Sequence, residues 1–156
     1  KQGVGYEVGF LRNELRKILN LEQEMAVALV GVGSLGEALA RYHLKRYADT
    51  DSFNLRLVAL FDSDPAKVGR EVEGITISSL EEVPQKVAEQ QIKVVILAVP
   101  ADAAQDVANR FVRAGVRCIL NYAPVKLITP ETVQVATVDL SLELQRLAYY
   151  VPKNAN

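Results

Sequence analysis

The sequence predicts an α/β protein built on a doubly wound parallel sheet. Short apolar runs alternate with longer stretches of helical periodicity, which is the pattern of strand–helix–strand units. One run, Ala26–Val30, leads into the glycine-rich segment Gly31–Gly36, and helical spacing follows over Glu37–Lys45. A second run, Leu55–Phe61, ends in an acidic residue, Asp62. Strand, glycine turn, helix, strand and carboxylate, in that order, are typical of a Rossmann-type dinucleotide-binding fold.

The glycine-rich segment reads G-V-G-S-L-G, a G-x-G-x-x-G motif placed between a strand and a helix as its mechanism requires. Gly31 allows a tight turn, Gly33 lets a pyrophosphate approach the backbone, and Gly36 lets the helix pack closely on the strand. Phosphates would lie at the helix N-terminus, where backbone N–H groups lack partners. We therefore expect the whole turn to bind the cofactor: Gly31, Val32, Gly33, Ser34, Leu35 and Gly36.

Asp62 is expected to accept hydrogen bonds from the adenosine ribose of the cofactor. The alternative is that it only caps a turn before Asp64-Pro65. A carboxylate at this position repels a 2′-phosphate, so the sequence favours NAD(H) over NADP(H). Lys67, which we also assign to the cofactor site, and Arg70 carry positive charge that reduces this preference.

Residues at the ends of the later predicted helices are of the types that cap or end a helix. Ser78 or Ser79 is suited to cap one helix, Asp102 is suited to cap the next, and Gly115 is suited to end it. The remaining elements are expected to follow in alternation: strand Ile75–Ile77, helix Leu80–Gln90, strand Val94–Val99, a helix ending at Ala114, strands Val116–Leu120 and Thr132–Leu140, and a last helix over Ser141–Val151.

Composition excludes several classes of partner. The formal net charge of −1 at pH 7 supplies no basic field for nucleic acid. No run of about 18 apolar residues is present, so we expect no membrane partner. Cys118 is the only cysteine and cannot form an internal disulfide, which is consistent with a cytoplasmic location. No cluster of cysteine and histidine supports a metal site.

Catalytic residues are not evident, and we expect no enzyme activity. His43, the only histidine, is interpreted as a helix-surface residue, and Cys118 as a core thiol in a strand. Tyr122 and Lys126 match a Y-x-x-x-K spacing, but Pro124 lies between them. The cofactor is therefore predicted to be bound without being used. Two alternatives remain: the cofactor domain of an NAD-dependent oxidoreductase that lacks its substrate domain, and a CoA- or nucleotide-binding domain of similar fold.

Several segments together resemble the Rex family of redox-sensing transcriptional repressors. The resemblance implies a Rossmann domain that senses the NADH/NAD⁺ ratio, with NADH as the ligand that releases operator DNA. It also implies a homodimer in which each C-terminal helix crosses into the partner's Rossmann domain. The segments are G-V-G-S-L-G at 31–36, F-D-S-D-P-A-K-V-G at 61–69, A-V-P at 98–100, N-Y-A-P at 121–124 and V-D-L-S-L-E-L-Q-R-L at 138–147.

Further cofactor residues follow from this resemblance by position. Tyr42 resembles the family's tyrosine near the nicotinamide ring, although it could instead be a core-facing helix residue. Asp139 resembles an acidic residue that reaches this site from the partner. Tyr122 stands where the family commonly has Phe. The residues implied to line the path toward the nicotinamide are Val99, Pro100, Asn121, Tyr122, Ala123 and Pro124.

Three segments are predicted along the chain. Residues 1–19 would be the remnant of a winged-helix domain and a linker. The segment G-V-G-Y-E-V at 3–8 resembles the wing strand at the end of that domain, and a linker helix is expected over Val8–Leu19. Residues 20–140 would form the NAD(H)-binding domain, and residues 141–156 a dimerisation helix and tail. Since most of a DNA-binding domain is absent, operator DNA is expected as a partner of the full-length protein and not of this fragment.

Overall fold

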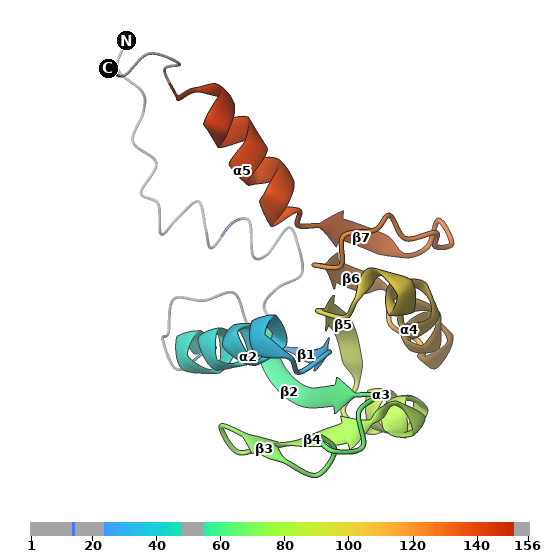
Figure 1. Ribbon diagram of the computed structural model, residues 1–156. Coiled ribbons are helices and arrows are strands. Elements are labelled where there is room, and N and C mark those ends of the chain that lie inside the picture. Colours follow the sequence, from blue (N-terminus) through green and yellow to red (C-terminus); the bar gives the residue numbers. More distant parts are fainter. Residues whose placement is uncertain (1–13, 15–23, 48–54, 152–156) are drawn as a thin grey trace.

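One sheet of seven strands forms the centre of the computed structural model (Figure 1). Its strands are β1 (Met25–Val30), β2 (Leu55–Asp62), β3 (Glu71–Val72), β4 (Ile75–Ser79), β5 (Ile92–Leu97), β6 (Cys118–Asn121) and β7 (Gln134–Thr137). They lie in the order β3-β4-β2-β1-β5-β6-β7, and only the β3–β4 pairing is antiparallel. Without β3 this is the 3-2-1-4-5-6 order of the Rossmann fold. The predicted doubly wound sheet is therefore confirmed.

The structure describes residues 14, 24–47 and 55–151. The helical elements in these ranges are α2 (Ser34–Tyr47), the 3-10 turn η1 (Leu80–Glu82), α3 (Val83–Glu89), α4 (Ala101–Ala114) and α5 (Leu140–Tyr149). Apart from Glu14, the predicted linker helix Val8–Leu19 lies outside the described residues. Within the described part of the chain, every helix is too short or too polar to span a membrane.

The core consists of two apolar clusters, one on each face of the sheet. The larger lies under α3 and α4, where the rings of Phe61 on β2 and Phe111 on α4 meet edge to face at 5.4 Å. The smaller lies under α2, where Ala40 packs with Leu29 and Leu60. All five side chains are fully buried. The alternation of apolar side chains along each strand thus supplies both faces, as a doubly wound sheet requires.

A short hairpin, β3–β4, is absent from the sequence prediction. Glu73 (φ 49°) and Gly74 (φ 89°) both occupy the left-handed region, as the two central residues of a tight hairpin turn do. Arg41 on α2 forms ion pairs with both Glu73 and Glu37 and so ties the hairpin to the helix. The hydrogen bond from Arg41 lowers the pKa of the Glu37 carboxyl below its ordinary value.

Helix ends agree with the predictions in part. Ser79 precedes η1, and its N–H donates to the Glu82 carboxylate at 2.9 Å, as in a capping box. Gly115 ends α4 in the left-handed conformation (φ 111°), which confirms its predicted role. The expected cap at Asp102 is wrong. The helix begins directly after Pro100, which takes the N-cap position, and Asp102 lies in the first turn.

The interpretation of Cys118 as a core thiol is also wrong, because this side chain is exposed. Cys118 lies on β6, on the face of the sheet opposite α4. On that face the main contacts of α2 are with β1, β2 and β3. On this face Leu120 of β6 is partly buried and Cys118 is exposed, so β6 and β7 are only partly covered among the described residues.

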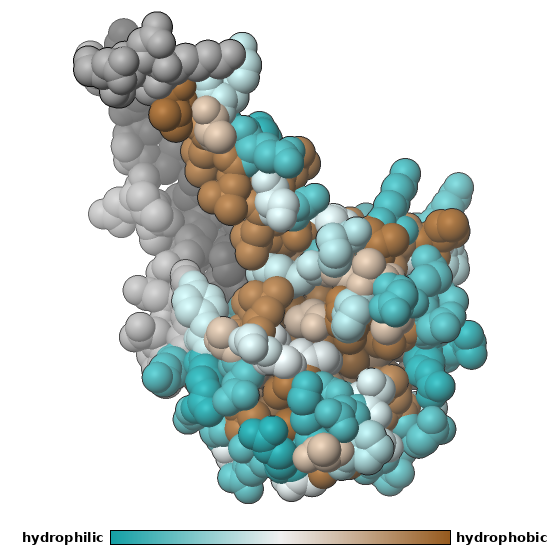
Figure 2. Space-filling model, in the orientation of Figure 1, coloured by the Kyte–Doolittle hydropathy of each residue, from teal (hydrophilic) through white to brown (hydrophobic). Residues whose placement is uncertain are grey.

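Helix α5 extends from β7 away from the rest of the domain (Figure 1). None of its residues is buried. Figure 2 shows a brown, apolar surface along this helix. Its exposed large apolar side chains, with those that follow, are Leu140, Leu142, Leu144, Leu147, Tyr149, Tyr150 and Val151. Such a contiguous apolar surface is characteristic of a contact site.

We predict that Phe111→Ala lowers the free energy of unfolding by about 3–5 kcal/mol, since it removes a buried aromatic side chain and leaves a cavity. Ile128→Ala is the matched control. Ile128 is 82% exposed, so its truncation should change stability by less than about 0.5 kcal/mol. Chemical denaturation monitored by circular dichroism measures both values. Equal losses in the two variants would contradict the assignment of the core.

Candidate functional site

The segments that follow β1, β2, β5 and β6 meet at the carboxyl edge of the sheet. Backbone hydrogen bonds continue past the strand ends and hold these segments together. Gly31 N–H donates to the Phe61 carbonyl at 2.9 Å, and Ala98 N–H donates to the Val30 carbonyl at 2.8 Å. Tyr122 N–H donates to the Leu97 carbonyl at 2.9 Å. This edge is the place where open α/β sheets bind ligands.

A cavity of about 680 Å³ lies at this edge. Its volume falls in the range of small-molecule sites, roughly 300–1,000 Å³. Most of the residues predicted from the sequence line it: Gly31, Gly33, Ser34, Leu35, Gly36, Asp62, Lys67, Val99, Pro100, Tyr122 and Pro124. The others are not part of the lining: Val32, Tyr42, Asn121, Ala123 and Asp139.

The three glycines of the motif have different surroundings. A Cβ on Gly31, whose φ is +93°, would collide with the Ala98 carbonyl, and a Cβ on Gly36 would overlap the Gly31 carbonyl oxygen. A Cβ on Gly33 would meet no atom within 4 Å. Gly31 and Gly36 are therefore required by the fold itself. Gly33 leaves open space in the cavity at the start of α2, so a phosphate group fits against its backbone.

Asp62 holds the glycine turn against the end of β2. The residue is 6% exposed, and its Oδ2 accepts the N–H of Val32 at 2.7 Å. Oδ1 accepts the N–H of Asp64 at 2.8 Å, so the turn-capping alternative considered from the sequence is present. Lys67 Nζ lies 3.8 Å from Oδ2. A carboxylate has about four lone-pair sites, so acceptor capacity remains for a ligand.

At the other end of the cavity the walls are mainly apolar. Ala98, Val99 and Pro100 come from the segment after β5, and Tyr122 and Pro124 from the segment after β6. We call these five residues the apolar end. Asp62 and Lys67 lie on the other side of the glycine turn, after β2. The cavity is therefore polar where it meets β2 and apolar where it meets β5 and β6.

Asn121 shapes the apolar end from behind. Its side chain is fully buried, Nδ2 donates to the Val125 carbonyl at 2.8 Å, and Oδ1 accepts the Ala123 N–H at 3.0 Å. Both polar groups of the amide are thus used within the turn. This arrangement presents Tyr122 and Pro124 to the cavity, while Asn121 and Ala123 remain buried.

Gln105, which the sequence analysis missed, holds the same segment further along. Its Oε1 accepts the N–H of Ile128 at 2.8 Å, and its Nε2 donates to the Ile128 carbonyl at 2.9 Å. The amide therefore pairs with the Ile128 backbone as a neighbouring strand would. This pairing ties α4 to the segment that follows Pro124. No local sequence signal indicates it, because the partners are distant in the chain.

Helix α4 also contributes a stripe of cavity residues that the sequence analysis missed. Ala103, Asp106, Val107 and Arg110 line the cavity. Their i, i+3, i+4 and i+7 spacing after Pro100 is the signal that could have found them, since such residues share one helix face. Other missed lining residues are Val30, Ser63, Asp64, Leu80 and Ala98.

Tyr42 and Asp139 lie away from the cavity within one chain. Tyr42 on α2 is 52% exposed, so the core-facing alternative is wrong. Its ring packs edge to face on that of His43. Asp139 is the N-cap of α5, and its Oδ1 accepts the Leu142 N–H at 3.0 Å.

Neither His43 nor Lys126 belongs to the cavity lining. Among the described residues, no three acidic, cysteine or histidine side chains are grouped as metal ligands.

Comparison with known proteins agrees with this geometry. A family model described as "CoA binding domain" matches residues 22–125. The redox-sensing transcriptional repressor Rex of Roseiflexus sp. strain RS-1 is 44% identical over the whole chain, which spans 69% of that protein. Rex of Chloroflexus aurantiacus strain J-10-fl is 46% identical over 98% of this chain and 70% of its own. The chain belongs to the Rex family of redox-sensing transcriptional repressors.

Solved Rex structures share the fold. The Rex-family repressor RSP in complex with β-NADH superposes with a TM-score of 0.80 at 34% identity, covering 94% of this chain and 69% of that one. RSP in complex with β-NAD⁺ and operator DNA gives the same TM-score and identity, over 96% of this chain and 66% of that one. The family membership predicted from the motifs is confirmed, and the family is one of transcriptional regulators.

We predict that Gln105→Leu accelerates hydrogen exchange at the Ile128 amide by about tenfold, equivalent to the loss of one hydrogen bond of about 1–1.5 kcal/mol. Gln85→Leu is the control, because Gln85 hydrogen-bonds only the exposed Glu89 side chain on its own helix. Exchange is followed residue by residue by NMR. An unchanged Ile128 amide in Gln105→Leu would show that the Gln105 pairing does not hold this segment.

Proposed function

We propose that this chain is the NAD(H)-sensing core of a Rex repressor, in which the NADH/NAD⁺ ratio decides whether the full-length protein holds operator DNA. NADH is the releasing ligand. The observation that carries the proposal is the open space at Gly33, at the start of α2, within a cavity that also receives Asp62. The complexes of the relative RSP with β-NADH, and with β-NAD⁺ and operator DNA, support the choice of ligand.

In this proposal the residues divide the dinucleotide between them. The backbone of Gly33–Gly36 and the first turn of α2 hold the pyrophosphate. Asp62 accepts hydrogen bonds from the adenosine ribose, and its negative charge favours NAD(H) over NADP(H). Lys67 lies beside this carboxylate and faces the same ligand. The nicotinamide lies at the apolar end, against Val99 and Tyr122.

The apolar end also suits the sensing of redox state. The nicotinamide ring is a cation in NAD⁺ and neutral in NADH. Burying a charge without a partner costs free energy, whereas burying a neutral ring does not carry this cost. Val99, Pro100 and Pro124 provide no negative charge to offset it. Within one chain, the walls of the apolar end therefore favour the reduced form.

We further propose that the chain binds the cofactor without transferring hydride to a substrate. The residues near the nicotinamide are apolar except for the Tyr122 hydroxyl, and Lys126 of the Y-x-x-x-K spacing lies outside the lining. Membership in a family of repressors favours this function over an oxidoreductase cofactor domain.

The proposed assembly is a homodimer that exchanges α5. The apolar residues of α5 are exposed in one chain, and the sheet face of Cys118 at β6 and β7 is only partly covered among the described residues. A closed, isologous exchange buries both surfaces. It also carries Asp139, the N-cap of α5, toward the partner's site, and Tyr42 contributes from α2. Residues 1–19, 20–140 and 141–156 are then the linker segment, the sensing domain and the dimerisation segment.

We predict that Gly33→Val abolishes NADH binding, because the added side chain occupies the space of the pyrophosphate while the fold has room for it. Ala88→Val on α3 is the control, since Ala88 is exposed and away from the cavity. Isothermal titration calorimetry measures both variants and the unmodified protein with NADH, NAD⁺, NADPH and CoA.

The unmodified protein should bind NADH more tightly than NAD⁺, and NADPH and CoA weakly. Unchanged NADH affinity in Gly33→Val would overturn the placement of the pyrophosphate. CoA binding that exceeds NADH binding would favour the alternative of a CoA-binding domain, and NADPH binding as tight as NADH would contradict the role of Asp62.

We predict that a double substitution, Leu144→Glu with Leu147→Glu, converts the dimer to monomers and weakens NADH binding, because it places charge in the exchanged apolar surface. Glu143→Gln on the same helix is the control and should remain dimeric. Sedimentation equilibrium gives the assembly state, and calorimetry gives the affinity. A monomer with full NADH affinity would contradict the shared site, and a persistent dimer would contradict the exchange.

A further inference from the structure

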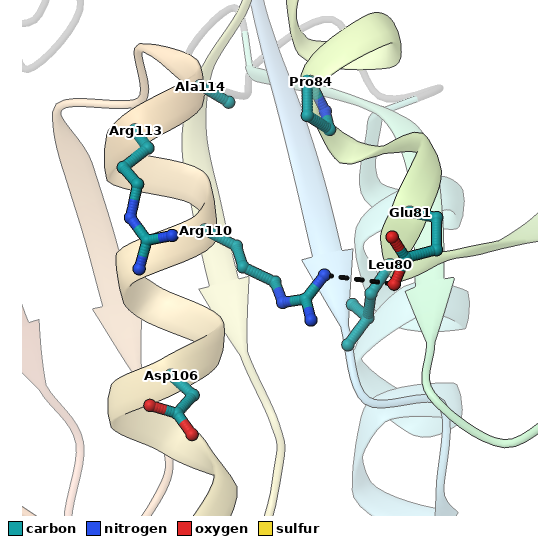
Figure 3. Close-up of a pocket in the computed structure, with 7 residues that line it drawn as sticks. All are labelled: Leu80, Glu81, Pro84, Asp106, Arg110, Arg113 and Ala114. Atoms are coloured by element: carbon teal, nitrogen blue, oxygen red, sulfur yellow. Dashed lines mark hydrogen bonds and ion pairs between the residues drawn. The ribbon is translucent and has the colours of Figure 1, made fainter.

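A second cavity, of about 500 Å³, lies between α3 and α4 (Figure 3). Leu80, Asp106 and Arg110 line both this cavity and the dinucleotide cavity, so the two spaces adjoin at these residues. They lie on the side of Ser63 and Asp64, which follow Asp62. In the proposed function this is the adenosine side, and the inference below depends on that function.

Arg110 spans the boundary between the two cavities. Its side chain extends from α4 across to η1, where Nη1 lies 3.3 Å from Oε1 of Glu81 (Figure 3). Leu80 lies beside this pair in the same view. Arg113, one turn further along α4, lines only the second cavity. The ion pair is exposed and contributes little to folding stability, and it directs the guanidinium toward η1.

The charges around Arg110 are mostly negative. Asp62, Asp64 and Asp106 line the dinucleotide cavity on this side, and Glu81 pairs with Arg110 itself. The other cation there, Lys67, lies beside Asp62. An additional phosphate group would meet three carboxylates and two cations that already have acidic neighbours. This arrangement disfavours a 2′-phosphate or a 3′-phosphate as the ligand of Arg110.

A flat aromatic base fits the same position. A guanidinium is planar and stacks on aromatic faces, and a leucine side chain provides an apolar face. We propose that Arg110 determines specificity for the adenine base of the dinucleotide. The base lies between the Leu80 side chain and the Arg110 guanidinium, and Glu81 keeps that guanidinium in its stacking orientation. The sensing of redox state is then separate from the recognition of the adenosine half.

The test measures the affinities of NADH, NAD⁺ and ADP-ribose by calorimetry for the unmodified protein and for three variants. Arg110→Leu should weaken all three ligands by about two- to fivefold, the typical effect of losing one cation–π contact at a partly exposed site. The NADH/NAD⁺ affinity ratio should stay the same, because the two ligands have the same adenosine half. Arg113→Leu, the matched control, should bind all three ligands as the unmodified protein does. Glu81→Gln should give a smaller loss, because Arg110 remains but is no longer held.

Each outcome bears on the proposal separately from the proposed function. Unchanged ADP-ribose affinity in Arg110→Leu would overturn the role of Arg110, and so would an equal loss in Arg113→Leu. A changed NADH/NAD⁺ ratio would show that Arg110 acts on the nicotinamide end instead. Thermal unfolding checks that the variants fold, and if Arg110→Leu does not, Glu81→Gln carries the decision. If the unmodified protein binds neither NADH nor NAD⁺, it is the proposed function that fails.

Discussion

The close approach of α2 to the end of β1 is the constraint on which the site depends. The helix can begin there only because Gly36 has no side chain to overlap the Gly31 carbonyl, and because Gly31 adopts a positive φ. Asp62 then fastens the turn from β2 through the N–H of Val32. These contacts place the N-terminus of α2 and the open face of Gly33 at the switch point of the sheet, where the cavity forms.

The cavity combines two chemical environments on one rigid sheet edge. The β2 side carries carboxylates and cations, which suit the ribose and the polar half of a dinucleotide. The β5 and β6 side carries Val99, Pro100 and Pro124, which suit an uncharged ring. The side chains of Asn121 and Gln105 hold the segment after β6 through hydrogen bonds to its backbone. The shape of this part of the wall therefore does not depend on contacts made by the residues that line the cavity. In the proposed function, this arrangement distinguishes NADH from NAD⁺ by the charge of the nicotinamide ring.

A single chain leaves apolar surface without a partner. Helix α2 covers one part of its sheet face, and β6 and β7 keep side chains such as Cys118 exposed on that face. The leucines and tyrosines of helix α5 are exposed, and none of its residues is buried by the described part of the chain. The proposed exchange brings these two surfaces together. In this proposal Asp139, which does not line the cavity of its own chain, contributes to the site of the other chain.

The sequence by itself determined the fold class, the position of the glycine turn, the place of Asp62 at the end of a strand, and the family. These features depend on residues that are close in the chain, where propensity, periodicity and turn chemistry act directly. Only the tertiary structure decided what depends on distant partners. It placed Gln105 against Ile128 and Arg110 against Glu81, because α4 lies between the segment after β6 on one side and η1 on the other. It also exposed Cys118, because the covering of a strand face depends on where the helices pack, and the local pattern of the strand does not contain that information.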